Sequence, residues 1–470
     1  MKAAVNELPL RDKFLKQFEE QKELLFSRDT KSMAGLREEG YKVFKKIGFP
    51  HKRLENWRNT DLAKILNRDY KQEFDIQQEA VNVEDLFECK VHDFDTEITS
   101  LLNGWYVYTD SPLKKLPDGT IIGSLAKAMK DYPELVDKYY GKAFKVDQNG
   151  FTALNTAFAQ DGVFIYVPDN VQVAKPVQMI NIINKNEDIF IQNRNLVILG
   201  KNAELTLVHC DDSVNHHASF TNSLTEAVVG QNASLDFYKL QNLNNNSSLV
   251  NSSFFSLERD SKLKTNAITL NGGMIRNNIH VSLNGENGAA DIFGVYLMDR
   301  EQHVDNQVFV DHKVPNCYSN ELFKGILDEK ASGVFNGHIM VRRDAQQTNA
   351  YQNNKNLLLT DDATMHTQPF LEIYADDVKC SHGATVGQLD NEAMFYLRSR
   401  GIDADKARML MMYAFAAEVI DKISIEALKV RIDDMVKKRL RGELSICDRC
   451  VLHCTEPEKE IQFDIDLSKI

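Results

Sequence analysis

Three short stretches of the chain decide its fold: GKNAEL at residues 200–205, GQNASL at 230–235 and ERDSKL at 258–263. Their closing leucines lie 30 and then 28 residues apart, and alternating residue types follow each leucine. Alternation with a period of two is the pattern of a β-strand. Its return at a near-constant interval indicates successive turns of a β-solenoid, where each turn buries its inward row by stacking on the next.

The alternation also assigns the residues of these turns to faces. The row expected to point inward is Leu205, Leu207, Leu235, Phe237, Leu263 and Thr265, and the row expected to point outward is Thr206, Asp236 and Lys264. Two asparagine-rich stretches, at residues 242–246 and 277–278, are predicted as tight turns, because asparagine tolerates left-handed backbone. A β-sandwich with hairpins at the same spacing is the alternative architecture.

Helical patterns lie on both sides of this region. Residues 10–26 and 35–48 repeat apolar residues at steps of three and four. Residues 403–423 and 424–442 are predicted as two further helices, with Asp403 as the N-cap of the first and a glycine ending the second. The predicted fold is mainly β and has four parts: an N-terminal helical domain at 1–95, a linking strand and helix segment at 96–149, the β-solenoid core at 150–390, and a C-terminal helical domain with a cysteine-rich tail at 391–470.

The composition of the 470 residues is that of a globular protein, with 43% hydrophobic and 26% charged residues. A formal net charge of -12 argues against a general nucleic-acid binder, which needs a basic surface. The sequence has no apolar run long enough to cross a membrane and no apolar signal core in its first residues. We therefore expect a cytoplasmic protein that binds no membrane, with its 7 cysteines reduced.

Cys380 and His382 form the first candidate site. If the surrounding residues form a strand, the two side chains share a face, because they are two positions apart. A thiolate beside an imidazole can bind a soft or borderline metal, or the imidazole can activate the thiol as a nucleophile. Two ligands do not complete a tetrahedral site, so further ligands would come from elsewhere. From spacing alone, a buried cysteine beside a hydrogen-bonded histidine is the favoured interpretation.

The C-terminal tail holds a denser cluster, in which Cys447, Cys450, His453 and Cys454 lie within eight residues. The C-x2-C spacing beside a histidine is typical of ligands for zinc or an iron–sulfur cluster. The C-x2-C pair could also act as a redox dithiol. Reduced thiols without a function are the alternative. We favour metal or redox chemistry, although a second C-x2-C half is absent.

The remaining candidates are interpreted as structural or surface residues. The isolated cysteines Cys89, Cys210 and Cys317 are expected to be structural. The acids and histidines of residues 303–312, HVDNQVFVDH, could suggest a metal-dependent hydrolase, but without a partner motif they are interpreted as polar residues on the protein surface. The sequence has no glycine-rich phosphate loop, so a nucleotide-binding α/β domain is not expected.

Five longer blocks stand in one order along the chain. They are RLENWRNTDL at Arg53, ALNTAFAQDGVFIYVP at Ala153, HVDNQVFVDHKVPNCYSNELFKGILDEKASGVFNGHIMV at His303, DAQQTNAYQNNKNLLLTDDA at Asp344 and DDVKCSHGATVGQLDNEAMFYLRSRGI at Asp376. Together they resemble the SufD branch of the SufB/SufD family of iron–sulfur cluster assembly proteins. The similarity spans nearly the whole chain and is densest from residue 303 to residue 402.

Particular positions favour the SufD branch over its sister, SufB. In the SufB pattern a functional cysteine stands where this chain has Asn354. The SufB pattern also has His-Glu where this chain has His382-Gly383. These two departures, together with the block that contains Trp57, resemble SufD.

The resemblance implies a right-handed parallel β-helix core between N-terminal and C-terminal helical domains, in agreement with the patterns above. It implies pairing with a SufB-like subunit through the β-helix and with a SufC-like ABC ATPase through the C-terminal helices. It also implies that His382 is a metal ligand and Cys380 a nearby thiol at the SufB–SufD interface, where a nascent cluster or iron is held transiently. The resemblance lends no support to the cysteine-rich tail.

The sequence therefore predicts a non-catalytic scaffold subunit with no tightly bound cofactor of its own. ATP hydrolysis is expected in the SufC-like partner, and two copies of the isolated chain are expected to pair by analogy with the SufB–SufD pair. One rival hypothesis is a β-helix carbohydrate-active enzyme, which usually carries a secretion signal and clustered acids. The other rival is a purely structural partner in which His382 and Cys380 are inert.

Overall fold

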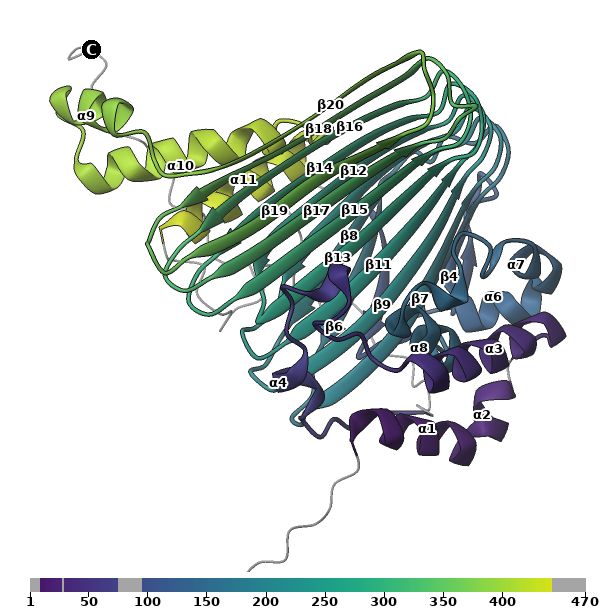
Figure 1. Cartoon of the computed structure of the whole chain (residues 1–470). Coiled ribbons are helices and arrows are strands. Elements are labelled where there is room, and N and C mark those ends of the chain that lie inside the picture. Colours follow the sequence, from purple (N-terminus) through teal and green to yellow (C-terminus); the bar gives the residue numbers. More distant parts are fainter. Residues whose placement is uncertain (1–8, 28, 75–94, 442–470) are drawn as a thin grey trace, which may run out of the picture.

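The structure is a computed structural model in which residues 9–27, 29–74 and 95–441 are described. Two ten-stranded sheets of these residues face each other and form a parallel β-solenoid of about eight turns (Figure 1). From β5 onward, successive strands alternate between the two sheets, so each turn of the chain contributes one strand to each sheet. Helices lie at both ends of the sequence, and the predicted mainly β fold class is confirmed.

The two sheets are named here by their strands, given in spatial order. Sheet A consists of β19 (Thr364–Ile373), β17 (Ser332–Val341), β15 (His303–His312), β13 (Met274–Leu283), β11 (Ser248–Leu257), β9 (Ser219–Val229), β7 (Ile189–Leu199), β5 (Val163–Val167), β4 (Ile121–Ser124) and β3 (Leu113–Lys115). Sheet B consists of β2 (Trp105–Val107), β1 (Glu97–Leu102), β6 (Val177–Ile183), β8 (Glu204–Ser213), β10 (Ser234–Asn242), β12 (Lys262–Asn271), β14 (Ala289–Met298), β16 (Tyr318–Leu327), β18 (Thr348–Leu358) and β20 (Val378–Gly387).

The predicted stack of leucines lies inside the solenoid. Leu235 of β10 pairs in parallel register with Leu205 of β8 on one side and with Leu263 of β12 on the other. All three side chains are at most 3% exposed and belong to the core between the sheets. Burying one such side chain stabilises the fold by roughly 1.5–3 kcal/mol. The repeat in the sequence is therefore the inward row of the solenoid.

The corners between sheet A and sheet B use the third residue of each quoted repeat. Asn202, Asn232 and Asp260 have φ angles of 55°, 56° and 58°, and Asn287 of the next turn has 60°. Asparagine and aspartate are among the few residue types that adopt this left-handed conformation readily. Their side chains also join neighbouring corners, because Asn232 Nδ2 donates to Asn202 Oδ1 at 2.9 Å.

The turn predicted at residues 277–278 is wrong, because Asn277 and Asn278 lie buried within strand β13. Asn277 Nδ2 donates to Asn306 Oδ1 at 3.0 Å, and Asn278 Nδ2 donates to Ser252 Oγ at 3.1 Å. Partners on neighbouring strands thus satisfy both amides inside the sheet. Of residues 242–246, Asn242 ends β10 and the other four occupy the corner after it, but none of the five has a positive φ.

The N-terminal helices cover the outer face of the first strands of sheet A, where the purple helices lie in Figure 1. Phe14 and Phe158 of these helices pack against Phe190 of β7, with Phe14 and Phe190 ring centroids 4.7 Å apart. The helix predicted over residues 10–26 is interrupted at Gln21. The helical elements here are α1 (Leu10–Glu20), α2 (Lys22–Phe26), α3 (Lys31–Ile47), η1 (Glu55–Trp57), α4 (Ala63–Leu66) and α8 (Gly150–Phe158).

The residues between this helical layer and the regular turns are themselves part of the solenoid. Strand β1 pairs in parallel with β6, so it extends sheet B, and β4 pairs antiparallel with β5 of sheet A. Helices α6 (Leu125–Asp131), α7 (Pro133–Tyr139) and η2 (Val146–Gln148) complete the connection. The first residues of the predicted solenoid range form α8 and not a strand. The division of the chain into domains stays a prediction.

The C-terminal helices are α9 (Asn391–Ser399), α10 (Ala404–Ile420) and α11 (Glu426–Leu440). Asp403 caps α10 as predicted, since its carboxylate accepts from Asp405 N at 2.9 Å. Helices α10 and α11 bury an apolar face against the outer face of sheet B. The glycine predicted to end the last helix lies outside the described residues. None of the helices within the described ranges has the length and apolar character that a membrane span requires.

Candidate functional site

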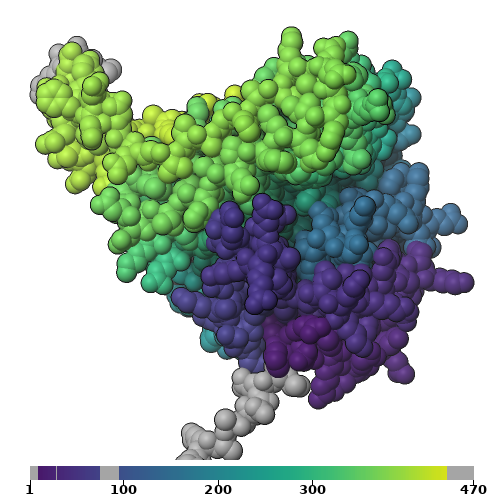
Figure 2. All heavy atoms as spheres, in the orientation of Figure 1, coloured from purple at the N-terminus to yellow at the C-terminus, as the bar shows by residue number. Residues whose placement is uncertain are grey.

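Strands β19 and β20 are the last strands of sheets A and B, and together they are called the open end. Each has a hydrogen-bonded neighbour on only one side. No described strand pairs with its other edge, so the backbone groups there are free to pair with another strand. Figure 2 shows the green C-terminal strands at the end of the molecule opposite the purple N-terminal helices. Phe370 of β19 is 49% exposed and Val386 of β20 is 43% exposed. The open end therefore combines free backbone edges with exposed apolar side chains.

The structure places Cys380 and His382 on the same face of β20, as the spacing predicted. Cys380 pairs in register with Ala350 of β18, and His382 pairs with Gln352. Ala350 and Gln352 are fully buried inside the solenoid, so the two candidate ligands stand at the inward positions of the last strand. They remain accessible because β20 is the edge of its sheet.

The two candidate ligands differ in environment. Cys380 is partly buried against the central core, and this burial raises the pKa of its thiol. His382 is exposed, and its imidazole makes no hydrogen bond or ion pair with the described residues. The favoured interpretation from spacing alone, a histidine held by a hydrogen bond, does not match this arrangement. A metal bound to Cys380 would need to displace the thiol proton.

Within the ranges that the structure describes, no group of three or more His, Cys, Asp or Glu side chains is placed to hold a metal ion. Cys380 and His382 are therefore at most two ligands of a site. Tetrahedral zinc sites and iron–sulfur clusters take more ligands than this pair supplies. Because the pair is exposed at an edge, the missing ligands can come from a second chain that meets the open end.

Beneath this pair lies a buried polar group that sequence reasoning missed. Gln352 Nε2 donates to Glu321 Oε2 of β16 at 2.7 Å, and both side chains are 0% exposed. Burial raises the pKa of Glu321 to about 8. Next to them, Asn354 Nδ2 donates to Tyr296 Oη at 3.2 Å. The alternation along β16 and β18 could have shown that Glu321 and Gln352 point into the solenoid.

The prediction that the polar residues of 303–312 lie exposed on the surface is wrong. They form β15, where Asp305 is buried and forms an ion pair with Arg276. The guanidinium of Arg276 lies 3.6 Å from the centre of the Trp57 ring, and Thr60 donates a hydrogen bond to Asp305. The N-terminal segment thus covers this part of sheet A. The contacts of Trp57 and Thr60 with Arg276 and Asp305 hold that segment against the solenoid.

The isolated cysteines agree with a structural role where they can be assessed. Cys210 and Cys317 are buried, and burial raises the pKa of Cys210 to about 12. Cys89 lies outside the described residues. The candidate ligands Cys447, Cys450, His453 and Cys454 also lie outside the described residues, so their metal or redox role stays a prediction.

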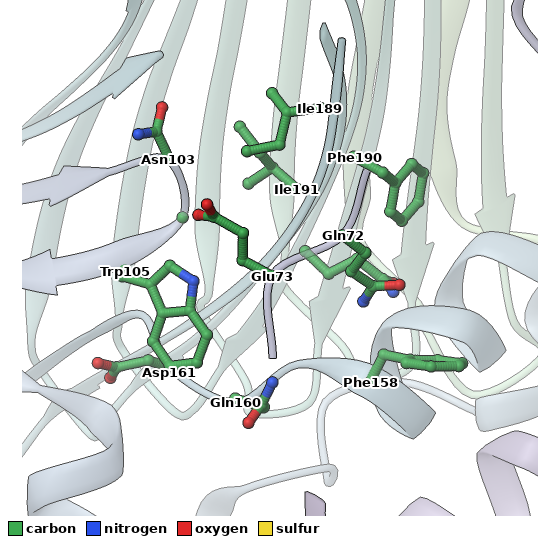
Figure 3. A pocket seen from close by; sticks show the side chains of 12 residues that line it. Gln72, Glu73, Asn103, Trp105, Phe158, Gln160, Asp161, Ile189, Phe190 and Ile191 are labelled. Carbon is green, nitrogen blue, oxygen red and sulfur yellow. The ribbon is translucent and has the colours of Figure 1, made fainter. Parts of the chain in front are cut away.

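A small polar pocket lies among the first strands of the solenoid and does not involve Cys380 or His382 (Figure 3). Side chains of Glu73, Trp105, Gln160 and Asp161 converge on it. Its volume of about 20 Å³ has room for about one water molecule. Asp161 accepts from Ser124 Oγ at 2.8 Å, and burial raises the pKa of its carboxyl group. The pocket is too small for a substrate.

Helix α9 is the second exposed feature at the C-terminal side. It has no buried residue, and it exposes Phe395 by 74% and Tyr396 by 56%. Asp390 caps the helix by accepting from Glu392 N at 2.8 Å. Aromatic residues on a helix that contributes nothing to the core are typical of a surface that binds another protein.

Residues 181–415 match the family model described as SUF system FeS cluster assembly, SufBD core domain. Residues 9–179 match the model described as SufBD protein N-terminal region. The first match covers the solenoid from β6 onward together with α9 and most of α10, and the second covers the N-terminal helices and the first strands of both sheets.

Three proteins similar to this chain in sequence are named as iron–sulfur cluster assembly proteins. The chain is 31% identical over 403 residues to the iron-sulfur cluster assembly protein SufD of Escherichia coli (strain K12), covering 84% of this chain and 90% of that protein. It is 30% identical over 326 residues to SufD of Bacillus subtilis (strain 168), covering 69% and 74%. It is 29% identical over 403 residues to an iron-sulfur cluster assembly SufBD family protein of Synechocystis, covering 84% and 88%.

Proposed function

Because the chain belongs to the SufB/SufD family of iron–sulfur cluster assembly proteins, we propose that it is a scaffold subunit whose open end receives a nascent cluster or iron. In this proposal a SufB-like subunit pairs with the open end. His382 supplies a metal ligand, and Cys380 supplies a nearby thiol. A SufC-like ABC ATPase binds the C-terminal helices.

The observation that carries the proposal is the position of Cys380 and His382. They occupy inward positions of a solenoid strand, yet they are accessible because no further strand of the described chain pairs with β20. A second solenoid that met this edge would cover Phe370 and Val386 and bring its own side chains to the pair. Exposed strand edges are suited to such pairing, because their free N–H and C=O groups need partners.

The contacts of the C-terminal helices suit them to transmit motion. Arg439 of α11 donates to Leu270 O at 2.8 Å and pairs with Asp299 at 2.6 Å. Lys324 of β16 donates to Phe415 O of α10 at 2.9 Å. Since α10 and α11 are fastened to sheet B while α9 projects, an ATPase that moved these helices would move the solenoid with them. Nucleotide-driven rotation of subunits is a known class of switching transition.

The chain itself performs no catalysis in this proposal. ATP hydrolysis belongs to the partner, and the cluster or iron is transient cargo that is passed on. We place the complex in the cytoplasm, where reduced thiols remain available as ligands. In isolation, two copies of the chain are expected to pair through the same open end, because the edges and apolar residues that await a SufB-like subunit are present on each copy.

The test is affinity purification of the tagged chain from its own cells under anaerobic conditions, with identification of the proteins recovered. We expect recovery of an ABC-type ATPase and a SufB-like subunit. Val386→Asp, which places a charge at the open end, should lose the SufB-like subunit and keep the ATPase. Phe395→Ala with Tyr396→Ala should do the reverse. Recovery of the wild-type chain alone, even after crosslinking, would contradict the proposal.

A further inference from the structure

The inward column beneath His382 contains buried polar atoms without hydrogen-bond partners in the part of the chain that the structure describes. In register, His382 of β20 stands beside Gln352 of β18, which stands beside Glu321 of β16. Gln352 donates through Nε2 to Glu321, and Gln352 Oε1 and Glu321 Oε1 are buried with no hydrogen-bond partner among the described residues. A buried amide oxygen without a donor destabilises a fold, so Gln352 Oε1 is suited to accept a hydrogen bond from a group beside it.

The surroundings of Gln352 fix its amide in place. A Cβ atom added at Gly337 of the facing strand β17 would lie 2.1 Å from Gln352 Nε2, so the amide reaches across the interior to a glycine. On the other side, Glu321 is fully buried, and its raised pKa makes the carboxyl group neutral at pH 7. A neutral acid can hold the amide without placing a charge in the interior. The Gln352 side chain is therefore held at both sides.

The nearest side chain in register on the open side of Gln352 is His382. Neighbouring strands lie about 4.8 Å apart, which is within reach of a glutamine amide and an imidazole. The imidazole of His382 makes no hydrogen bond with the described residues, and it carries the N–H that Gln352 Oε1 lacks. A histidine that binds a metal through one ring nitrogen usually donates its other N–H to a fixed oxygen.

We infer that Gln352, anchored by Glu321, is the positioning residue for His382: its Oε1 accepts the inward N–H of the imidazole, so that the other ring nitrogen faces a metal at the open end. This inference rests on the proposed function of His382. It adds that the pair Gln352 and Glu321 selects the tautomer of His382. Neither residue touches the metal.

Two readouts on the purified full-length chain and on its complex test this role. Nitrogen-15 NMR of labelled histidine reports the tautomer of His382 in the chain, with His382→Ala to assign the signal. Binding of Co²⁺, used as a spectroscopic substitute for iron, reports the affinity of the site in the complex. We expect Gln352→Leu to convert a single tautomer to a mixture and to weaken Co²⁺ binding about tenfold.

The matched control is Gln241→Leu, which removes another fully buried inward amide, on β10, far from the open end. It should leave both the tautomer of His382 and Co²⁺ binding unchanged. If Gln352→Leu fails to fold, Glu321→Leu serves, because it replaces a desolvated acid by an apolar side chain and releases the Gln352 amide. A purely structural role for Glu321 predicts no change of tautomer in that variant, whereas the positioning role predicts a mixture.

The outcomes separate this inference from the proposed function. If His382→Ala abolishes Co²⁺ binding at the open end while Gln352→Leu retains both the tautomer and the affinity of the wild type, the positioning role is overturned and the ligand role stands. If His382→Ala binds Co²⁺ like the wild type, the ligand role fails and the positioning role fails with it.

Discussion

The outer face of sheet A differs between its first strands and its last. At the first strands, Arg194 and Glu226 form a fully buried ion pair at 2.6 Å, and Tyr140 covers the guanidinium at 3.8 Å. At the last strands, His338 and Glu372 form a pair at 3.0 Å with side chains 32% and 29% exposed. The N-terminal helices cover the first pair, and none of the described elements encloses the second to the same degree. The difference shows that the first strands enclose their ion pair, whereas the last strands leave theirs partly exposed to solvent.

The largest expected effect is on the stability that the buried ion pair of the first strands provides. Glu226→Gln leaves the Arg194 cation buried without its counter-charge, which should cost roughly 3–5 kcal/mol of unfolding free energy. Glu372→Gln at the open end should cost much less than this, because water screens the pair. Urea unfolding of the two variants measures both values. Equal losses of stability would show that the two regions are not different in this respect.

The next effect concerns pH and the buried acid under the open end. The pKa of Glu321 is raised to about 8 from the ordinary 4.5, so below pH 4.5 the group is neutral in both the folded and the unfolded chain. Above that pH the unfolded chain ionises first, and stability falls by about 1.4 kcal/mol per pH unit until the folded carboxyl group ionises near pH 8.

Glu321→Gln removes this loss, so its stability relative to the wild type should rise between pH 5 and pH 8, by on the order of 4 kcal/mol at most. Unfolding free energies of the two proteins at several pH values in this window measure the slope. The exposed Glu204→Gln on β8 is the control for a general effect of removing a carboxylate. A difference between Glu321→Gln and the wild type that stays constant with pH would contradict the buried acid.

The smallest expected effect is the loss of stability when the N-cap of α9 or of α10 is removed. Asp390 caps α9, which buries nothing, and Asp403 caps α10, which packs on sheet B. Replacing either with alanine should cost about 1 kcal/mol. For Asp390→Ala the loss should appear only as faster amide hydrogen exchange within α9, by about fivefold. For Asp403→Ala it should appear in the global stability. A global loss in the Asp390→Ala variant would mean that α9 is part of the core.

The sequence predicted those features that depend on a repeated local rule. Leu205, Leu235 and Leu263 could be placed inside because the same alternation returns in every turn, and a stack of turns fixes their register. The shared face of Cys380 and His382 followed from the same period of two. Both inferences need only the geometry of a strand.

The features that the sequence did not reveal depend on contacts between segments that are far apart in the chain. The local pattern at Asn277 predicts a turn, because it cannot show that Asn306, on a strand 29 residues later, satisfies the Asn277 amide. The local pattern at Asp305 predicts a surface residue, because its partner Arg276 and the covering Trp57 come from distant segments. The exposure of His382 likewise depends on β20 being the last strand of its sheet.

The most direct test of the functional role of the open end is cluster assembly with His382 removed. The complex should be purified anaerobically from cells whose only copy of this chain is the wild type, His382→Ala or His217→Ala, and its iron and acid-labile sulfide should be measured. His217 is another exposed histidine, at a corner between β8 and β9 and far from the last strand in sequence, and is the matched control. We predict that His382→Ala assembles with its partners but carries about tenfold less iron and sulfide, while His217→Ala is loaded like the wild type. Normal loading of the His382→Ala complex would contradict the account.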